Sequence, residues 1–142
     1  CSSLEKILEK NHDLESGNLI MKMDIEGAEW EELRNTPSAL LSRFSQITLE
    51  LHDVCKLENR DKILDALQKL NMTHQAVWVH GNNSNWAEEA NGTIMPNLLE
   101  ATFVSRTNYL FESGKCIFPM PLDLPNLNGR WDFDLGNWGS IG

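Results

Sequence analysis

The sequence predicts an α/β fold built as one domain, with helices flanking a small sheet. Apolar runs of strand length at residues 19–23, 46–52 and 72–79 alternate with segments of helical periodicity. Connections long enough to hold a helix favour parallel strands joined by right-handed crossovers. The chain has 142 residues, 41% of them hydrophobic, which suffices for one hydrophobic core.

The first part of the chain predicts helices around a buried strand. Residues 2–10 begin with a capping-box pattern and continue with apolar residues at helical spacing. Residues 19–23 are almost continuously apolar, which is typical of a strand covered on both faces. A helical pattern covers residues 28–33, Pro37 interrupts it, and Ser38 caps a further short turn.

The second part predicts three more strands. Apolar and polar residues alternate in residues 46–52, which places the polar ones on one face. Residues 57–70 predict an amphipathic helix that leads into a third strand, residues 72–79. No helical pattern separates this strand from a fourth at residues 98–105, so these two are expected to be antiparallel neighbours. The predicted sheet therefore has three parallel strands plus one antiparallel strand.

Proline and glycine mark the limits of this domain. We expect the α/β domain to span residues 1–111 and an irregular tail, residues 112–142, to pack on it. The tail is rich in both residues, and its aromatic side chains, including Trp131 and Trp138, would pack it. Residues 81–96 predict a long polar loop, and loops of this length are usually functional or disordered.

Charge and composition exclude several classes of function. The chain carries 21 acidic and 12 basic residues, a net charge of -9, which opposes binding to nucleic acid or to an anionic membrane. No apolar run approaches the length of a membrane span, and the N-terminus lacks the pattern of a targeting segment. A neutral or cationic partner fits this charge better.

Cysteines and sequons bear on the compartment. The three cysteines are an odd number without close spacing, which favours free thiols and a cytoplasmic location over a disulfide framework or a metal knuckle. Sequons at Asn71, Asn82 and Asn91 leave a secretory lumen open.

The first three predicted strands all run into ionisable or amide side chains. These are Asp24 and Glu26 at the first strand, Glu50, His52 and Asp53 at the second, and His80, Asn82 and Asn83 at the third. In an open parallel sheet, the carboxyl ends of the strands lie along one edge, where ligands bind. The sequence therefore predicts one site built from these clusters.

The acidic residues also have structural explanations. Asp24, Glu26 and Glu29 suit the start of a helix, where a side chain caps the backbone or pairs with the helix dipole. Gly27 suits a sharp turn from strand to helix that requires positive φ or close backbone approach. Glu50 lies within a strand and must be paired or reach the open edge, because burying an isolated charge is very costly.

The histidines and asparagines leave a similar choice. His52 and His80 suit a general base or a metal ligand, and equally an ordinary polar residue at a strand end. Together with the carboxylates after the first strand they could hold a divalent cation, although the spacing identifies no particular metal. Asn82 and Asn83 could orient a hydroxylated substrate or make the turn.

A resemblance to a known family rests first on residues 20–33. This stretch, IMKMDIEGAEWEEL, closely resembles the signature of the FkbM-type methyltransferases. Residues 46–52, 79–83 and 96–104 follow in the order and spacing of the C-terminal half of that family. The resemblance implies an S-adenosylmethionine-dependent O-methyltransferase, often acting on sugar hydroxyls. It also implies a seven-stranded Rossmann-like sheet, of which the four predicted strands are the fourth through seventh.

The resemblance implies roles for the residues at the strand ends. Asp24 would lie beside the donor methyl group, as a catalytic and cofactor-binding residue. His52 or His80 would be the catalytic base for the hydroxyl of a small-molecule or glycan acceptor. The acceptor pocket would be shaped by the remaining polar residues, Glu26, Glu50, Asn82 and Asn83.

The chain departs from the family pattern upstream of Asp24. The superfamily holds its cofactor mainly by a glycine-rich turn after the first strand and an acidic residue after the second. Neither occurs in this sequence. We therefore expect the acceptor-side half of the domain, a fragment or truncated relative that is inactive alone. The strand at residues 19–23 would be an exposed sheet edge, through which copies of the chain could associate.

Two other functions fit the same residues. Asp24, His52 and His80 could serve a metal-dependent hydrolase. A noncatalytic interaction domain could keep this fold without the cofactor half. The acceptor is not defined by the sequence, because function lives in sites grafted onto folds.

Overall fold

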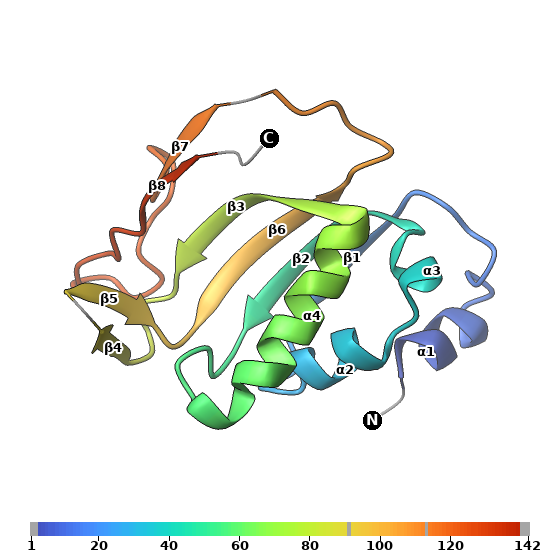
Figure 1. Cartoon of the computed structure of the whole chain (residues 1–142), viewed down its shortest axis with the longest axis horizontal. Helices are drawn as coiled ribbons and strands as arrows, with labels where there is room; N and C mark the ends of the chain where they lie inside the picture. The colour runs from blue at the N-terminus through green and yellow to red at the C-terminus, as the bar shows by residue number, and fades with distance from the viewer. Residues whose placement is uncertain (1–2, 91, 113, 140–142) are drawn as a thin grey trace.

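The structure is a computed structural model that describes residues 3–90, 92–112 and 114–139. Its central sheet has the strand order β1-β2-β6-β3 (Figure 1). The strands are Leu19–Met23 (β1), Phe44–Leu51 (β2), His74–Gly81 (β3) and Leu99–Ser105 (β6). β1 pairs with β2 in parallel, whereas β6 is antiparallel to both of its neighbours. The fold is therefore α/β with a mixed sheet, as predicted at that level.

The position of β6 corrects one part of the predicted sheet. β3 runs in the same direction as β1 and β2, but β6 lies between β2 and β3 and pairs with both. The predicted directions, three strands one way and one the other, are therefore confirmed, as is the antiparallel pairing of β3 with β6. The expected direct pairing of the second with the third strand is wrong. The connection from β3 to β6 contains the β4–β5 ladder and no helix in its described residues, so the chain returns antiparallel beside β3. β6 then occupies the place next to β2 that the third strand was expected to take.

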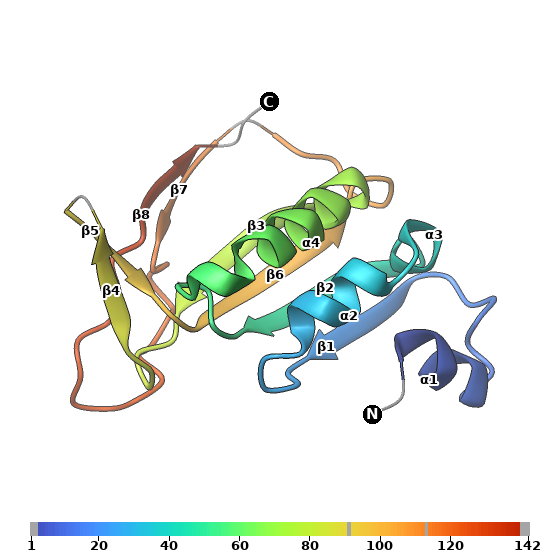
Figure 2. The same cartoon turned by 60° about the horizontal axis from the view of Figure 1, so that its bottom comes forward.

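Helices cover one face of the sheet. Figures 1 and 2 show α2 and α4 side by side over this face, with α1 beyond the β1 edge. The helical elements are Leu4–Lys10 (α1), Glu29–Asn35 (α2), Ser38–Leu41 (α3), the 3-10 turn Leu57–Asn59 (η1) and Arg60–Thr73 (α4). Ser3 caps α1 by accepting a hydrogen bond from the backbone N–H of Lys6, and Ser2 lies outside the described residues. α4 continues to Thr73, so the third strand begins at His74, two residues later than predicted.

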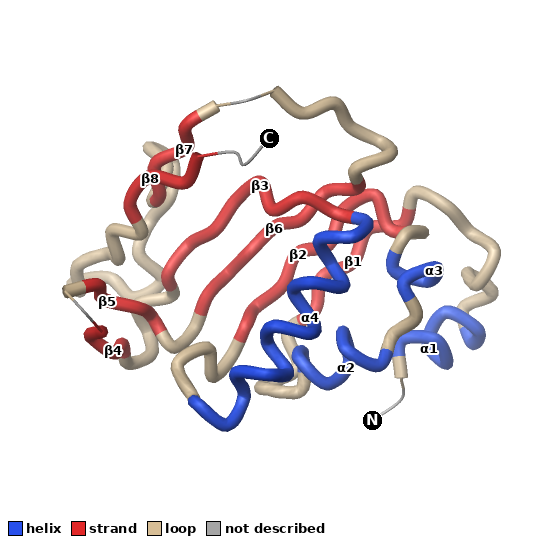
Figure 3. Tube along the Cα trace, in the orientation of Figure 1, coloured by secondary structure: helices blue, strands red, loops and turns tan. Residues whose placement is uncertain are grey.

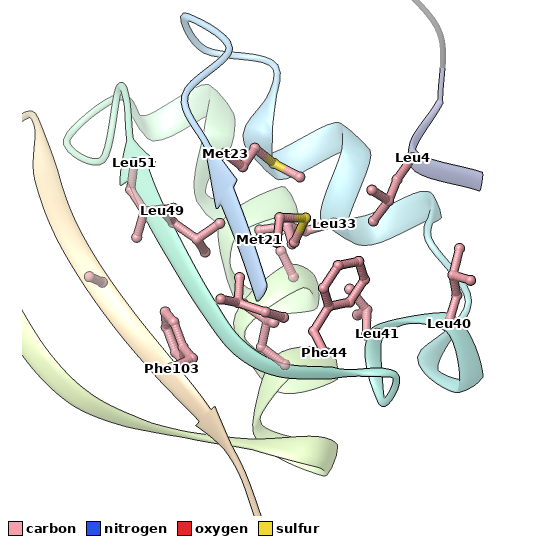
Figure 4. Close-up of a cluster of buried hydrophobic side chains, with 14 of the residues drawn as sticks. Leu4, Met21, Met23, Leu33, Leu40, Leu41, Phe44, Leu49, Leu51 and Phe103 are labelled. Atoms are coloured by element: carbon pink, nitrogen blue, oxygen red, sulfur yellow. The ribbon is translucent and has the colours of Figure 1, made fainter. Parts of the chain in front are cut away.

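The hydrophobic core lies between the helices and the sheet. Figure 4 shows Met21 of β1, Leu33 of α2 and Leu49 of β2 within one cluster of buried side chains. Leu33 and Ile47 are fully buried, and truncating such a residue to alanine costs about 2 to 5 kcal/mol. This packing fixes β1 and β2 relative to α2, and with them the turn that joins β1 to α2.

The opposite face of the sheet is polar. Along β2 the side chains of Thr48 and Glu50 alternate with buried leucines and lie opposite Thr102 and Glu100 of β6. In β1, Ile20 is 72% exposed, so the expectation that this strand is covered on both faces is wrong for the described part of the chain. The run at residues 19–23 was apolar enough to suggest burial, yet only alternate side chains reach the core.

Two short antiparallel ladders of two strands each complete the described chain. Ala87–Ala90 (β4) pairs with Thr93–Pro96 (β5), within the stretch expected to be a loop. Lys115–Phe118 (β7) pairs with Gly136–Gly139 (β8), within the tail expected to be irregular. Figure 3 shows both ladders at the end of the sheet away from α1. The partners in the tail are far apart in sequence, so local composition gave no sign of their pairing.

Two findings concern the cysteines and the membrane. Cys55 and Cys116 are free thiols, and Cys1 lies outside the described residues. A search of the described ranges finds no helix with the length and hydrophobicity that a membrane crossing requires.

Candidate functional site

The turn from β1 into α2 is held in an uncommon backbone conformation. Glu26 has φ 58° and Gly27 has φ 101°. Positive φ was expected at Gly27, but Glu26 bears a side chain, and such a conformation is disfavoured for most residues other than glycine. Strained backbone of this kind persists where the surrounding structure holds it in place.

Glu29 provides that support. Its side chain is fully buried and accepts backbone hydrogen bonds from Ile25 at 2.8 Å and from Gly27 at 3.0 Å. Its Oε1 also lies 3.1 Å from Nδ1 of His52. The indole N–H of Trp30 donates to the carbonyl oxygen of His52 at 2.7 Å. The first turn of α2 is thereby fastened to the end of β2.

Three of the predicted site residues meet at this turn. Ligand atoms of Asp24, Glu26 and His52 all lie within 4.8 Å of one another. Nε2 of His52 is 3.4 Å from a carboxylate oxygen of Glu26, whose side chain is 86% exposed. Carboxylate and imidazole groups in this arrangement can bind hydroxyl groups or hold a divalent cation.

Glu50 extends this cluster along the sheet. Its carboxyl group lies close enough to that of Asp24 for the two to interact. Partial burial, the contact with Asp24 and the charges of Asp24 and Glu100 raise the pKa of Glu50, and only the charge of His52 opposes this. No ion pair with a basic residue is recorded for Glu50 among the described residues. Its partners are another carboxyl group and an amide.

That amide is Asn82. It lies in the middle of a row of polar side chains, here called the polar row, which runs from Asp24 and His52 through Glu50 and Asn82 to Glu100 and His80. Its Nδ2 donates to Glu50 at 3.2 Å and to Glu100 at 3.1 Å. Its Oδ1 accepts from the backbone and the hydroxyl of Ser84. The buried position of Asn82 opposes glycosylation there, whereas Asn71 is exposed and Asn91 lies outside the described residues.

His80 occupies the other end of the row. It is buried, with Nε2 at 3.0 Å from Asp132 and Nδ1 at 3.6 Å from Glu100. Its ring stacks on Trp78 at a centroid distance of 5.8 Å. Glu100 also accepts a hydrogen bond from Asn126 at 2.6 Å. The segment of residues 119–134 therefore covers this histidine.

Asn83 holds the same segment in place. Its Nδ2 donates to the carbonyl oxygens of Leu127, Arg130 and Trp131, and its Oδ1 accepts from the backbone N–H of Leu127 at 2.7 Å. Arg130 in turn donates to the carbonyl oxygen of Asn83. The structure gives Asn83 a role in packing, and its contact with an acceptor stays a prediction.

The polar row thus has two ends with different surroundings. We call Asp24, Glu26, Glu50 and His52 the open end. We call His80, Asn83 and Glu100, together with the segment of residues 119–134, the covered end. Next to the covered end, a recess of about 540 Å³ lies between the β4–β5 ladder and residues 130–133.

Asp53 takes no part in the row. Its side chain pairs with Lys56 at 2.8 Å and accepts from Asn97 at 3.3 Å. The hydrogen bond from the Lys56 ammonium lowers the pKa of Asp53. It supports the loop after β2.

Three residues in or next to the row were not predicted as site residues from the sequence. Glu100 lies near the start of β6, and because β6 is antiparallel this start is at the edge where the other strands end. Glu29 could be recognised only as a residue of a first helical turn. Asp132 lies in the proline- and glycine-rich tail, where no local pattern indicates its approach to His80.

Comparisons with known proteins add no relative to this description. Protein-family models, curated proteins and solved structures were compared with the chain, and none matches it.

Proposed function

We propose that this chain is the acceptor-side half of an S-adenosylmethionine-dependent O-methyltransferase that acts on a hydroxyl group of a sugar or another hydroxylated small molecule. The observation that carries the proposal is the open end itself. A carboxylate pair, Asp24 and Glu50, lies beside His52 at the edge where β1 and β2 end. Ligands of open α/β sheets bind at this edge. The resemblance of residues 20–33 to the FkbM signature points to the same residues.

The charge of the open end suits both reactants. S-Adenosylmethionine would supply a methyl group on a positively charged sulfur, and carboxylates favour such a cation close by. Asp24, Glu26 and Glu50 also offer acceptors for the hydroxyl hydrogens of a neutral acceptor. The chain has no glycine-rich turn after a strand, so the open end fits the methyl-bearing part of the cofactor and the acceptor, and not the whole cofactor.

His52 would remove the acceptor proton. When a hydroxyl oxygen bonds to a transferred carbon, its proton must leave, and a histidine within hydrogen-bond reach can take it. Nε2 of His52 faces the exposed side chain of Glu26. Asp24 and Glu50 would orient the hydroxyl groups next to the reacting one.

The test uses the full-length protein and methyl-labelled S-adenosylmethionine with a panel of sugars and other hydroxylated acceptors. Asp24→Asn should lower label transfer by about 10²-fold or more. Glu9→Gln is the matched control, because Glu9 is an exposed carboxylate on α1 with no recorded contact to the row among the described residues, and it should transfer label at the wild-type rate. Label transfer by Asp24→Asn at the wild-type rate would contradict the proposal. So would a coding sequence with no strand and glycine-rich turn within about a hundred residues upstream.

A metal-dependent hydrolase is the second candidate, favoured by the short distances within Asp24, Glu26 and His52. The set weighed from the sequence included His80, but His80 contacts Glu100 and Asp132 instead. Calorimetric titration with Mn²⁺ or Zn²⁺ tests this candidate. Glu58, an exposed carboxylate of η1, supplies the control. Binding that Asp24→Ala removes and Glu58→Ala retains would support this candidate. No heat of binding would eliminate it.

A further inference from the structure

We propose that Glu29 is a positioning residue that keeps a proton on Nδ1 of His52 and so presents the lone pair of Nε2 to the acceptor. This inference rests on the proposed function, because it assigns the catalytic form of the base in that site. Neither the sequence patterns nor the resemblance gave Glu29 this role.

The surroundings of Glu29 define its carboxylate as an acceptor. The side chain is 0% exposed, so water cannot satisfy it. Oε1 accepts from the backbone N–H of Ile25, and Oε2 accepts from the backbone N–H of Gly27. An ionised carboxylate can only accept hydrogen bonds. A buried oxygen 3.1 Å from Nδ1 of His52 is therefore favourable when that nitrogen carries a hydrogen.

The other ring nitrogen faces a different environment. Nε2 lies 3.4 Å from Glu26, which is mostly exposed and can turn into water. Within the described part of the chain, no buried group therefore requires a hydrogen on Nε2. In the neutral imidazole one nitrogen donates and the other accepts, so a proton on Nδ1 leaves Nε2 as the acceptor on the open side.

The position of the ring is fixed as well as its tautomer. Trp30 donates to the backbone carbonyl of His52, and Trp30 and Glu29 are neighbours in the first turn of α2. The strained turn at Glu26 and Gly27 is fastened by the same carboxylate. One buried residue thus sets the shape of the turn and the orientation of the base.

This arrangement has a consequence for proton transfer. As Nε2 takes the hydroxyl proton, the ring becomes positively charged, and the carboxylate on Nδ1 stabilises that charge without accepting the proton itself. Removing the carboxylate should therefore change the tautomer and the rate together. A residue that merely supported the fold would leave the tautomer of the ring unchanged.

The primary test is long-range ¹H–¹⁵N NMR of the full-length protein with ¹⁵N-labelled histidine. The pH should lie about two units above the ordinary histidine pKa of about 6.5. The wild-type ring should show the Nδ1–H tautomer. Glu29→Gln should shift it towards Nε2–H, because the glutamine amide can donate to Nδ1. Glu26→Gln is the matched control, since Glu26 faces Nε2, and it should keep the wild-type tautomer.

The outcomes separate this inference from the proposed function. An Nε2–H tautomer in the wild type, or an unchanged tautomer in folded Glu29→Gln, would overturn the role of Glu29. The wild-type spectrum decides the question even where Glu29→Gln does not fold. The spectra need no turnover, so an Nδ1–H tautomer in a protein that transfers no methyl group would sink the proposed function alone. In the active protein, Glu29→Gln should lower kcat by about 10²- to 10⁴-fold.

Discussion

The two ends of the polar row contain similar residues in different surroundings. At each end a histidine at the end of a strand lies between carboxylates. At the open end, His52 has one buried carboxylate and one exposed one. At the covered end, the ring of His80 is 3% exposed and meets carboxylates from β6 and from the C-terminal segment.

The difference arises from the path of residues 119–134. This segment reaches His80, Trp78 and Glu100 through the side chains of Asp132, Asp123 and Asn126, which occupy their polar atoms. No hydrogen bond from the segment to Asp24 or Glu26 is recorded among the described residues. Whether a histidine at the end of a strand can contact a ligand therefore depends on whether another segment of the chain packs against it.

The largest expected difference between the two ends is in catalysis. His52→Gln should lower the rate of methyl transfer by about 10²- to 10⁴-fold. It should lower the free energy of unfolding by only about 1 kcal/mol, because Glu29 keeps the backbone donors of Ile25 and Gly27. His80→Gln should keep a rate at least tenfold higher than that of His52→Gln. Its free energy of unfolding should fall by about 2 to 3 kcal/mol, because two carboxylates lose their partner. Rates normalised to the folded fraction and urea denaturation measure both. Equal loss of normalised rate in the two variants would contradict the claim that only the open end contributes to catalysis.

A second expected effect concerns the packing of the covered end. Asn83→Ala removes the amide that bonds Leu127, Arg130 and Trp131, and should lower the free energy of unfolding by about 2 to 3 kcal/mol. Asn85→Ala is the control, because Asn85 accepts only a local bond from the next backbone N–H, and should cost less than about 1 kcal/mol. If Asn83→Ala keeps full stability and loses acceptor binding, the role predicted from the sequence is the correct one.

Much of the fold could be predicted because it depends on local patterns. The bounds of β1, the helical segments and the antiparallel pairing of β3 with β6 follow from periodicity and connection length. The need for positive φ at Gly27 follows from a strand turning directly into a helix. The convergence of Asp24 and His52 follows from the parallel pairing of β1 and β2.

The remaining features depend on contacts between distant residues. Asp132 meets His80 across a sequence separation of 52, and Asn83 meets Trp131 across 48. No pattern in the tail specifies these pairs. Glu29 belongs to a helix that starts close to His52 only after α2 packs on the sheet, so its burial could not be inferred from a first-turn position.

The smallest expected effect tests whether the open end carries unfavourable charge at neutral pH. The pKa of Glu50 is raised in the folded state above its ordinary 4.5, first by burial and then by Asp24, so the folded state binds this proton more tightly than the unfolded state. Stability from Glu50 is therefore fully present below pH 4.5 and is lost as the pH rises through the folded pKa. Glu50→Gln cannot lose that proton, so urea denaturation across pH should show its stability, relative to wild type, increasing with pH. A relative stability of Glu50→Gln that falls with pH would mean that the open end stabilises its charged carboxylates, as expected for groups that are ionised and paired before a ligand binds.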